Sequence, residues 1–159
     1  MPSSRDHALD QLLVQNELRT LTLRYARAVD RRDYETLGEL FVEDGAIHVH
    51  RGDPLTTEPY LSLEGRAAII ELMQRIEEWE KTQHHLSNQL FESDGEQATG
   101  ESYCMAHHVS TLDGVPHDFT MAIRYQDRFV KDGDRWWFAT RRLWVDWERD
   151  APLGERGWS

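Results

Sequence analysis

Hydrophobic residues recur with a helical period in three segments of the first half of the chain. In residues 8–30, apolar side chains stand three and four positions apart, which places them on one face of a helix. Asp33 is a residue type that caps helices, so a short helix is expected between it and "EDG" at 43–45, and residues 66–80 predict a third helix. The three apolar faces are Leu18, Leu21, Tyr25 and Val29; Leu37, Leu40 and Phe41; and Ile69, Leu72, Met73 and Ile76.

The second half of the chain alternates apolar and polar positions, which is typical of strands. Asp-Gly pairs mark the turns between four long strands, and two shorter strands are expected before the third helix. The predicted strands are 46–50, 60–65, 83–93, 97–112, 117–131 and 135–147. Helices followed by an antiparallel meander predict an α+β fold in which the sheet wraps around the helices.

Two adjacent histidines interrupt the alternation in "TQHHLSNQLF" at 82–91. Successive side chains of a strand point to opposite faces, so the two histidines lie on different faces. The mainly apolar face carries His84, Leu86, Asn88 and Leu90, and the polar face carries His85, Ser87 and Gln89. Because an unpaired buried imidazole or amide costs roughly 1–3 kcal/mol, the inward histidine and asparagine indicate either a partly polar cavity or a hydrogen-bonded core histidine.

The strand 97–112 contains a second pair of adjacent histidines. Small side chains share a face with His108 and bulkier ones share a face with His107, so the face with His108 leaves more room for a ligand. The two faces are Ser102, Cys104, Ala106 and His108, and Tyr103, Met105, His107 and Val109. The pattern slightly favours His108 as the inward histidine.

Composition restricts the class of protein and its partners. The chain has 159 residues and a formal net charge of −11, which repels nucleic acid phosphates and anionic lipids. We therefore expect a small-molecule ligand, and neither nucleic acid nor a membrane as partner. Cys104 is the only cysteine, which favours a reducing cytoplasm. We expect neither a signal peptide nor a membrane span, because the first residues have no apolar stretch and no apolar run approaches about 18 residues.

Eight histidines make metal binding a hypothesis to consider. His48 and His50 share a strand face, and a set of two histidines and one carboxylate can be drawn from His84, His108 and Asp30. No cysteine-rich set, His-Glu-x-x-His helix or glycine-rich phosphate loop is present. We therefore expect no bound metal and no nucleotide or other cofactor.

Three segments together resemble the SnoaL-like branch of the nuclear transport factor 2-like superfamily. They are "RYARAVDRRDYETLGELFVEDGAI" (24–47), "TQHHLSNQLFESDGEQA" (82–98) and "DGDRWWFATRRLWVDW" (132–147). The shared elements are a Tyr-x4-Asp-x2-Asp helix end, a Leu-Phe-x-x-Asp-Gly turn, a His-x3-Asn strand and a Trp-x4-Arg final strand, and the resemblance covers about nine-tenths of the chain. It implies one domain, residues 1–150, in which N-terminal helices pack against a curved, mostly antiparallel sheet. This cone-shaped α+β barrel encloses a cavity, and residues 151–159 form a C-terminal tail.

Within this branch the chain resembles the scytalone dehydratase and hexachlorocyclohexane dehydrochlorinase families, whose members use a His–Asp dyad in the cavity. The resemblance implies that Asp30, at the end of the first helix, pairs with His84. His108 takes the place of the second dehydratase histidine, and Arg141 that of the dehydrochlorinase arginine. Tyr25 stands where the dehydrochlorinase has a lysine, and residue 29 is a valine where the dehydratase has one of its two catalytic tyrosines.

The remaining predicted substrate-binding residues are Asn88, on the face of His84, and Trp144 in the final strand. Each candidate also has a structural interpretation: Asp30 as a helix-end carboxylate, Tyr25 as core and Arg141 as a surface residue of an edge strand. Three tryptophans can line a pocket for an aromatic ligand, or pack in the core or at an oligomer contact. They are Trp136, Trp144 and Trp147.

A His–Asp dyad carries a definite chemical expectation. A carboxylate that accepts the Nδ1–H of His84 fixes the tautomer and leaves Nε2 free to act as a base. We therefore expect a cofactor-independent lyase or isomerase that performs a dehydratase-type elimination on a small hydrophobic or aromatic molecule. The alternatives are a non-catalytic β-subunit of an aromatic-ring-hydroxylating dioxygenase and a protein that binds a ligand unchanged. A homo-oligomer, either a dimer or a trimer, is expected.

Overall fold

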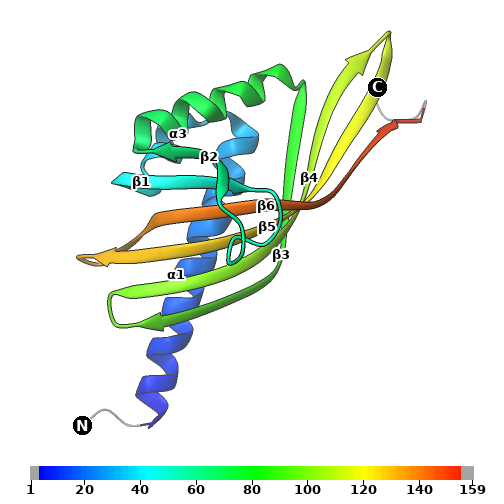
Figure 1. The fold of residues 1–159 in the computed structure, drawn as a ribbon. Helices are drawn as coiled ribbons and strands as arrows, with labels where there is room; N and C mark the ends of the chain where they lie inside the picture. The colour runs from blue at the N-terminus through cyan, green and yellow to red at the C-terminus, as the bar shows by residue number, and fades with distance from the viewer. Residues whose placement is uncertain (1–3, 155–159) are drawn as a thin grey trace.

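Helices come first in the chain and a meander of four long strands comes last (Figure 1). The computed structural model describes residues 4–154. The first part comprises α1 (Ser4–Arg31), α2 (Tyr34–Gly38), β1 (Phe41–His50), β2 (Pro59–Glu64), α3 (Arg66–Met73) and the 3-10 helix η1 (Gln74–Glu78). The meander comprises β3 (Lys81–Asp94), β4 (Gln97–Leu112), β5 (Val115–Asp132) and β6 (Arg135–Pro152).

All six strands form one sheet in the order β2-β1-β6-β5-β4-β3. Neighbouring strands are antiparallel except β1 and β6, which are parallel. The sheet curves around the helices without closing, so β2 and β3 are its edges (Figure 1). The predicted α+β fold is confirmed. We call the sheet face turned to the helices the inner face and the opposite one the outer face.

The main core lies between α1 and the inner face of the sheet. The predicted apolar stripe of α1 is buried there, against aromatic side chains from β1, β5 and β6. Tyr25 makes edge-on contacts with Phe41 and Phe138, at ring-centroid distances of 6.2 and 5.9 Å. No helix within residues 4–154 combines the length and apolar character needed to cross a membrane.

Strand pairing extends β1 and β6 well beyond the boundaries that the local pattern predicts. Residues 40 and 41 do not belong to α2, since Phe138 N–H donates to the Leu40 carbonyl and Phe41 pairs with Phe138 as the first residue of β1. The segment "EDG" lies inside β1, where the register shifts. Strand β6 continues to Pro152, which pairs with His117, so the first residues of the predicted tail belong to the sheet. Residues 155–159 of that tail lie outside the described residues.

Candidate functional site

Asp30 and His84 meet where the end of α1 lies against the edge strand β3. Asp30 Oδ1 is 2.7 Å from His84 Nδ1, and Asp30 Oδ2 accepts a hydrogen bond of 2.9 Å from the His84 backbone N–H. Because β3 has a free edge, this N–H has no neighbouring strand to donate to. The carboxylate therefore accepts the hydrogen bond of this strand-edge N–H and orients the imidazole at the same time.

The turn after α1 is held by Arg32, which the sequence analysis missed. Its backbone has a φ of 56°, a left-handed conformation that usually favours glycine at the end of a helix. Its guanidinium donates to the carbonyls of Asp30 and Trp79, both at 2.9 Å, and reaches Thr82 Oγ1 at 3.4 Å. Arg32 thereby joins the end of α1 to the end of η1 and the start of β3, the elements around the Asp30–His84 pair.

The Asp30–His84 pair is partly shielded from water, with side-chain exposures of 22% and 7%. Burial by itself raises the pKa of Asp30, but hydrogen bonds from the His84 imidazole and backbone outweigh it and hold that pKa below its ordinary value. Asp30 is therefore ionised at neutral pH. An ionised acceptor at Nδ1 favours the His84 tautomer that carries its proton on this nitrogen.

The inner face also carries His108, whereas His107 lies on the outer face. The His108 ring is 5.7 Å from that of His84, centroid to centroid, and its Nδ1–H donates to the Phe119 carbonyl at 3.2 Å. Burial, and next the neighbouring His84, lower the pKa of His108, so this ring is neutral at neutral pH. In both inner histidines, Nδ1 is engaged by the protein and Nε2 is the nitrogen left for a ligand.

Aromatic and aliphatic side chains surround the two inner histidines. Trp79 stacks on Phe119 at a ring-centroid distance of 5.8 Å and lies 5.2 Å from His108, contacts that the sequence analysis did not foresee. Burial raises the pKa of the Cys104 thiol to about 11, so it stays protonated and is a poor nucleophile. The apolar residues that pack together along this face are Leu86, Cys104, Ala106, Met121, Ile123, Tyr125, Leu143 and Val145.

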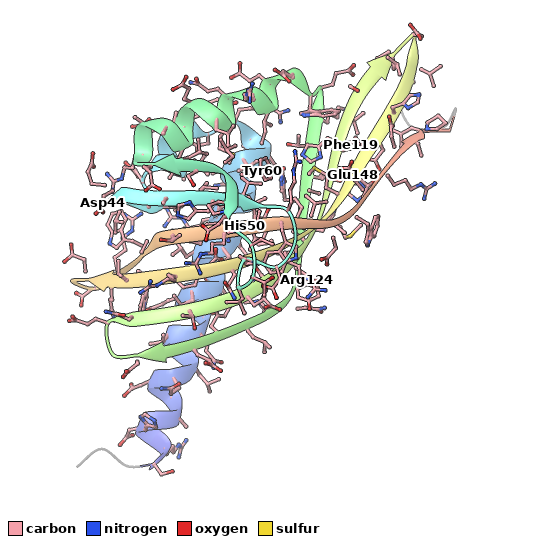
Figure 2. The ribbon with its side chains drawn as sticks, viewed as in Figure 1. Asp44, His50, Tyr60, Phe119, Arg124 and Glu148 are labelled. Carbon is pink, nitrogen blue, oxygen red and sulfur yellow. The ribbon has the colours of Figure 1, made fainter. Side chains whose placement is uncertain are left out.

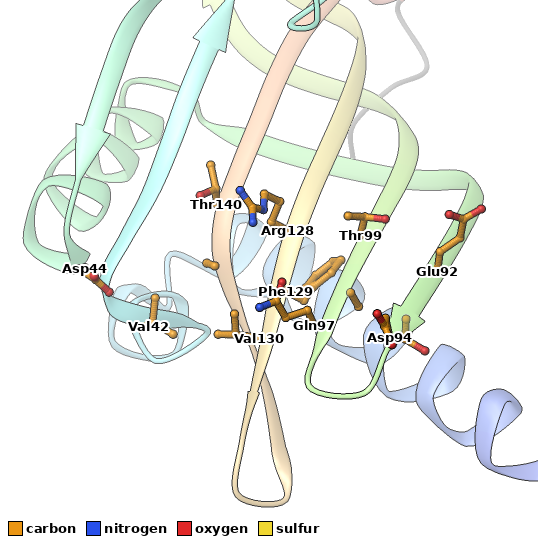
Figure 3. Close-up of a pocket in the computed structure, with 13 residues that line it drawn as sticks. Val42, Asp44, Glu92, Asp94, Gln97, Thr99, Arg128, Phe129, Val130 and Thr140 are labelled. Atoms are coloured by element: carbon orange, nitrogen blue, oxygen red, sulfur yellow. The ribbon is translucent and has the colours of Figure 1, made fainter. Parts of the chain in front are cut away.

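A pocket of about 560 Å³, a volume that suits a small ligand, is lined in part by Asp30 but by neither His84 nor His108. It runs past the edge of β3 to side chains at the adjoining ends of β4 and β5. Its lining includes Asp30, Arg32, Thr82, His107, Val109 and Asp118. A second pocket, of about 620 Å³, is lined by none of the predicted site residues; Val42, Asp44, Glu92, Arg128 and Thr140 contribute to it (Figure 3).

Asn88 is exposed, so the prediction that it shares the inner face with His84 is wrong. A register shift between Ser87 and Leu90 reverses the alternation of β3, and Asn88 adopts a φ of 47° there. Asparagine tolerates this left-handed conformation better than most residues. Beyond the shift, Gln89 takes the inner position and hydrogen-bonds to α1, whereas Leu90 is 75% exposed.

Trp144 lies on the outer face, so the prediction that it shares a site with Arg141 and His84 is wrong. Three positions separate Trp144 from Arg141, and a regular strand turns such residues to opposite faces. Trp144 lies beside Arg124, whose guanidinium carbon is 6.0 Å from its ring, and Arg124 stands on the side of the sheet away from α1 (Figure 2).

Arg141 is fully buried, three cross-strand rows along the inner face from His84. It makes two hydrogen bonds of 2.8 Å to Asp127, and its guanidinium carbon lies 4.1 Å from the ring centres of Tyr25 and Tyr125. Burial by itself lowers the pKa of Arg141, but the Asp127 carboxylate raises it above its ordinary value. Asp127 was not among the predicted site residues, although its place between inward aromatic residues of β5 was a usable signal.

The chain belongs to the SnoaL-like domain family, whose model matches residues 10–142. Comparison with curated proteins gave no match. Among solved structures, a function unknown protein from Mycobacterium tuberculosis aligns with a TM-score of 0.76 and 24% identity over 91% of this chain and 78% of its own. A protein described as a candidate scytalone dehydratase from Novosphingobium aromaticivorans aligns with a TM-score of 0.75 and 23% identity, covering 94% and 97%.

Dehydrochlorinases share the same architecture. The hexachlorocyclohexane dehydrochlorinase LinA-type3 from Novosphingobium barchaimii aligns with a TM-score of 0.74 and 15% identity, over 96% of this chain and 98% of its own. At these identities the likeness establishes a common fold, and the chemistry of this chain has to be argued from its own residues.

Proposed function

We propose that the chain is a cofactor-independent lyase or isomerase in which His84 acts as the general base. The observation that carries this proposal is the 2.7 Å contact between Asp30 Oδ1 and His84 Nδ1 beside an apolar inner face. An ionised Asp30 orients the imidazole and stabilises the imidazolium that forms once His84 takes a proton. Family membership adds support, because structures with this fold include proteins named as a dehydratase and as dehydrochlorinases.

The proposed reaction is an elimination. His84 Nε2 removes a proton from a carbon next to an electron-withdrawing group, a carbon–carbon double bond forms, and the carbon–oxygen bond to a hydroxyl breaks. The proton held by His84 then passes to the departing hydroxide, which leaves as water. An isomerase would return the same proton to a different carbon.

His108 is proposed to bind the hydroxyl group of the substrate. Its Nδ1–H is already donated to the Phe119 carbonyl, so its neutral Nε2 accepts a hydrogen bond. The rings of Trp79 and Phe119 beside it favour a small hydrophobic or aromatic molecule. Substrate contacts of Tyr25 and Arg141 remain predictions, since both side chains are buried in the core.

The test is turnover of a panel of hydrophobic and aromatic β-hydroxy ketones, followed by the ultraviolet absorbance of the conjugated product. Proton exchange from D2O into the substrate reports the proton-removal step separately. We expect turnover by the wild type and its loss in His84→Gln. A matched control is His117→Gln, because His117 also pairs with an aspartate, at 3.0 Å, but has no described contact with His84 or His108.

Unchanged turnover in a folded His84→Gln variant would contradict the proposal. Tight binding of panel members without exchange or turnover would instead favour a ligand-binding protein. Co-purification with a larger iron-containing chain would favour the dioxygenase subunit.

A further inference from the structure

The outer face of β3 and β4 carries a histidine pair that the proposed reaction does not use. His85 and His107 are the chain neighbours of His84 and His108, and strand alternation turns them to the other side of the sheet. Their ring centroids lie 5.7 Å apart with the ring planes at 84°. His85 is exposed, and the His107 side chain is 35% exposed, so solvent reaches this pair.

A carboxylate on β5 orients the His107 ring. Asp118 Oδ2 lies 2.7 Å from His107 Nδ1 and also accepts a hydrogen bond of 3.0 Å from the Thr120 hydroxyl. This acceptor favours the proton on Nδ1, which leaves a lone pair on Nε2. Because β4 lies between β5 and β3, an Nδ1 turned to β5 leaves the Nε2 side of the ring facing β3, where His85 stands.

We propose that His85 and His107 form a site for a divalent transition-metal ion of the zinc or copper(II) class. Imidazole nitrogens suit these ions, and a carboxylate on the other ring nitrogen is the usual outer partner of a metal-bound histidine. A zinc–nitrogen bond of about 2.0–2.1 Å places two coordinating rings roughly 5 Å apart at a tetrahedral angle. The observed separation of 5.7 Å is close to this distance.

The affinity of such a site is limited by its having two protein ligands. Across residues 4–154, no three histidine, cysteine, aspartate or glutamate side chains gather as metal ligands would. Water therefore completes the coordination, which the exposure of His85 permits. The inner pair has the same ring separation, but its burial would remove a divalent ion from water at a high cost in free energy.

The test is a zinc titration of the full-length chain by calorimetry at neutral pH, after treatment with a chelator. We expect one ion per chain, a loss of affinity of about tenfold or more in His85→Asn and in His107→Asn, and a loss of about 10–100-fold in Asp118→Asn. His117→Asn is the control, because His117 pairs with Asp150 but has no described contact with a second histidine ring. Copper(II) bound to the wild type should show two coordinating nitrogens by electron paramagnetic resonance, and one nitrogen in either single variant.

Equal weakening in His117→Asn and His107→Asn would overturn the proposal, because binding would then be spread over the surface histidines. Loss of binding in His108→Asn with full binding in His85→Asn would overturn it as well, by moving the ion to the inner pair. An absence of zinc binding to the wild type would also overturn it. Turnover in His85→Asn and His107→Asn, measured without added metal, tests the proposed function separately, because neither histidine takes part in the proposed reaction.

Discussion

The two histidine pairs of β3 and β4 differ in their surroundings, although their local geometry is nearly the same. His84 and His108 lie 5.7 Å apart on the inner face, and His85 and His107 lie 5.7 Å apart on the outer face. Each pair contains one histidine whose Nδ1 is 2.7 Å from an aspartate. The dipeptides "HH" at 84–85 and 107–108 therefore present similar groups to both sides of one sheet.

The two pairs differ in the element that supplies the carboxylate and in whether other side chains pack against the rings. Asp30 reaches His84 from the end of a helix, and Trp79 and Phe119 pack beside His108. The outer carboxylate, Asp118, comes from the sheet itself and leaves its pair open to solvent. Burial shifts pKa values and strengthens the interaction of Asp30 with a protonated His84, which favours acid–base chemistry inside. Exposure lets a hydrated metal ion reach the outer pair without a large desolvation cost.

The largest expected effect concerns the inner carboxylate. Asp30→Asn removes the charge that stabilises the imidazolium, so turnover of the proposed substrate is expected to fall by about 10²–10⁴-fold. Zinc affinity at the outer pair should stay unchanged, since the histidine that Asp30 hydrogen-bonds is His84 of the inner pair. Asp150→Asn serves as the control, because it alters an exposed His–Asp pair that has no described contact with either histidine pair. Equal turnover of Asp30→Asn and wild type would break the contrast between the pairs.

A matched comparison of ion pairs tests the same contrast in stability. Asp127→Asn leaves the buried Arg141 without its counter-charge and is expected to lower the free energy of unfolding by about 3–5 kcal/mol. Asp146→Asn breaks a pair of similar length with Arg124, at 2.7 Å, but on the outer face, where water screens it. Its effect on the urea midpoint should be too small to resolve. Similar losses in both variants would show that burial does not decide the strength of these pairs.

Arg32 tests whether the inner pair depends on the turn that presents it. In Arg32→Gly, glycine adopts the left-handed conformation of this position without strain, but the hydrogen bonds of the guanidinium are lost. Because the two effects oppose each other, the free energy of unfolding should change by less than about 1 kcal/mol. Turnover should nevertheless fall roughly tenfold to hundredfold, because Asp30 is less well positioned. The readout specific to positioning is the downfield proton resonance of His84 Nδ1–H, which should weaken. Arg31→Ala, at an exposed neighbour, should change neither quantity.

The smallest expected effect is the contribution of His108 to the loss of stability at low pH. Burial lowers the pKa of folded His108 below its ordinary value of 6.5, so the unfolded chain takes up this proton first as pH falls. The contribution of His108 to stability is therefore complete above about pH 6.5 and is lost as pH drops toward its lowered pKa. Urea unfolding across this range should show a shallower decline in His108→Gln than in wild type. Identical declines would mean that this histidine does not govern the acid response.

Alternation along a strand predicted much of the site, but only where the strand stays regular. It correctly placed His84 and Leu86 on the face of the helices, because no irregularity occurs before residue 87. It misplaced Asn88, because a bulge in an edge strand reverses every later side chain. No local signal in "LSNQ" reveals this bulge, since its position depends on how β4 pairs with β3.

The sequence by itself determined the α+β class, the order of the elements and the face on which most side chains lie. These follow from hydrophobic periodicity and Asp-Gly turns, which are local properties of the chain. Only the tertiary structure decided that Asp30 and His84 are in contact across 54 positions, and that Arg141 is paired with Asp127 in the core. Such contacts depend on the curvature of the sheet and on the angle at which α1 ends, and neither is encoded by the pattern of any single segment.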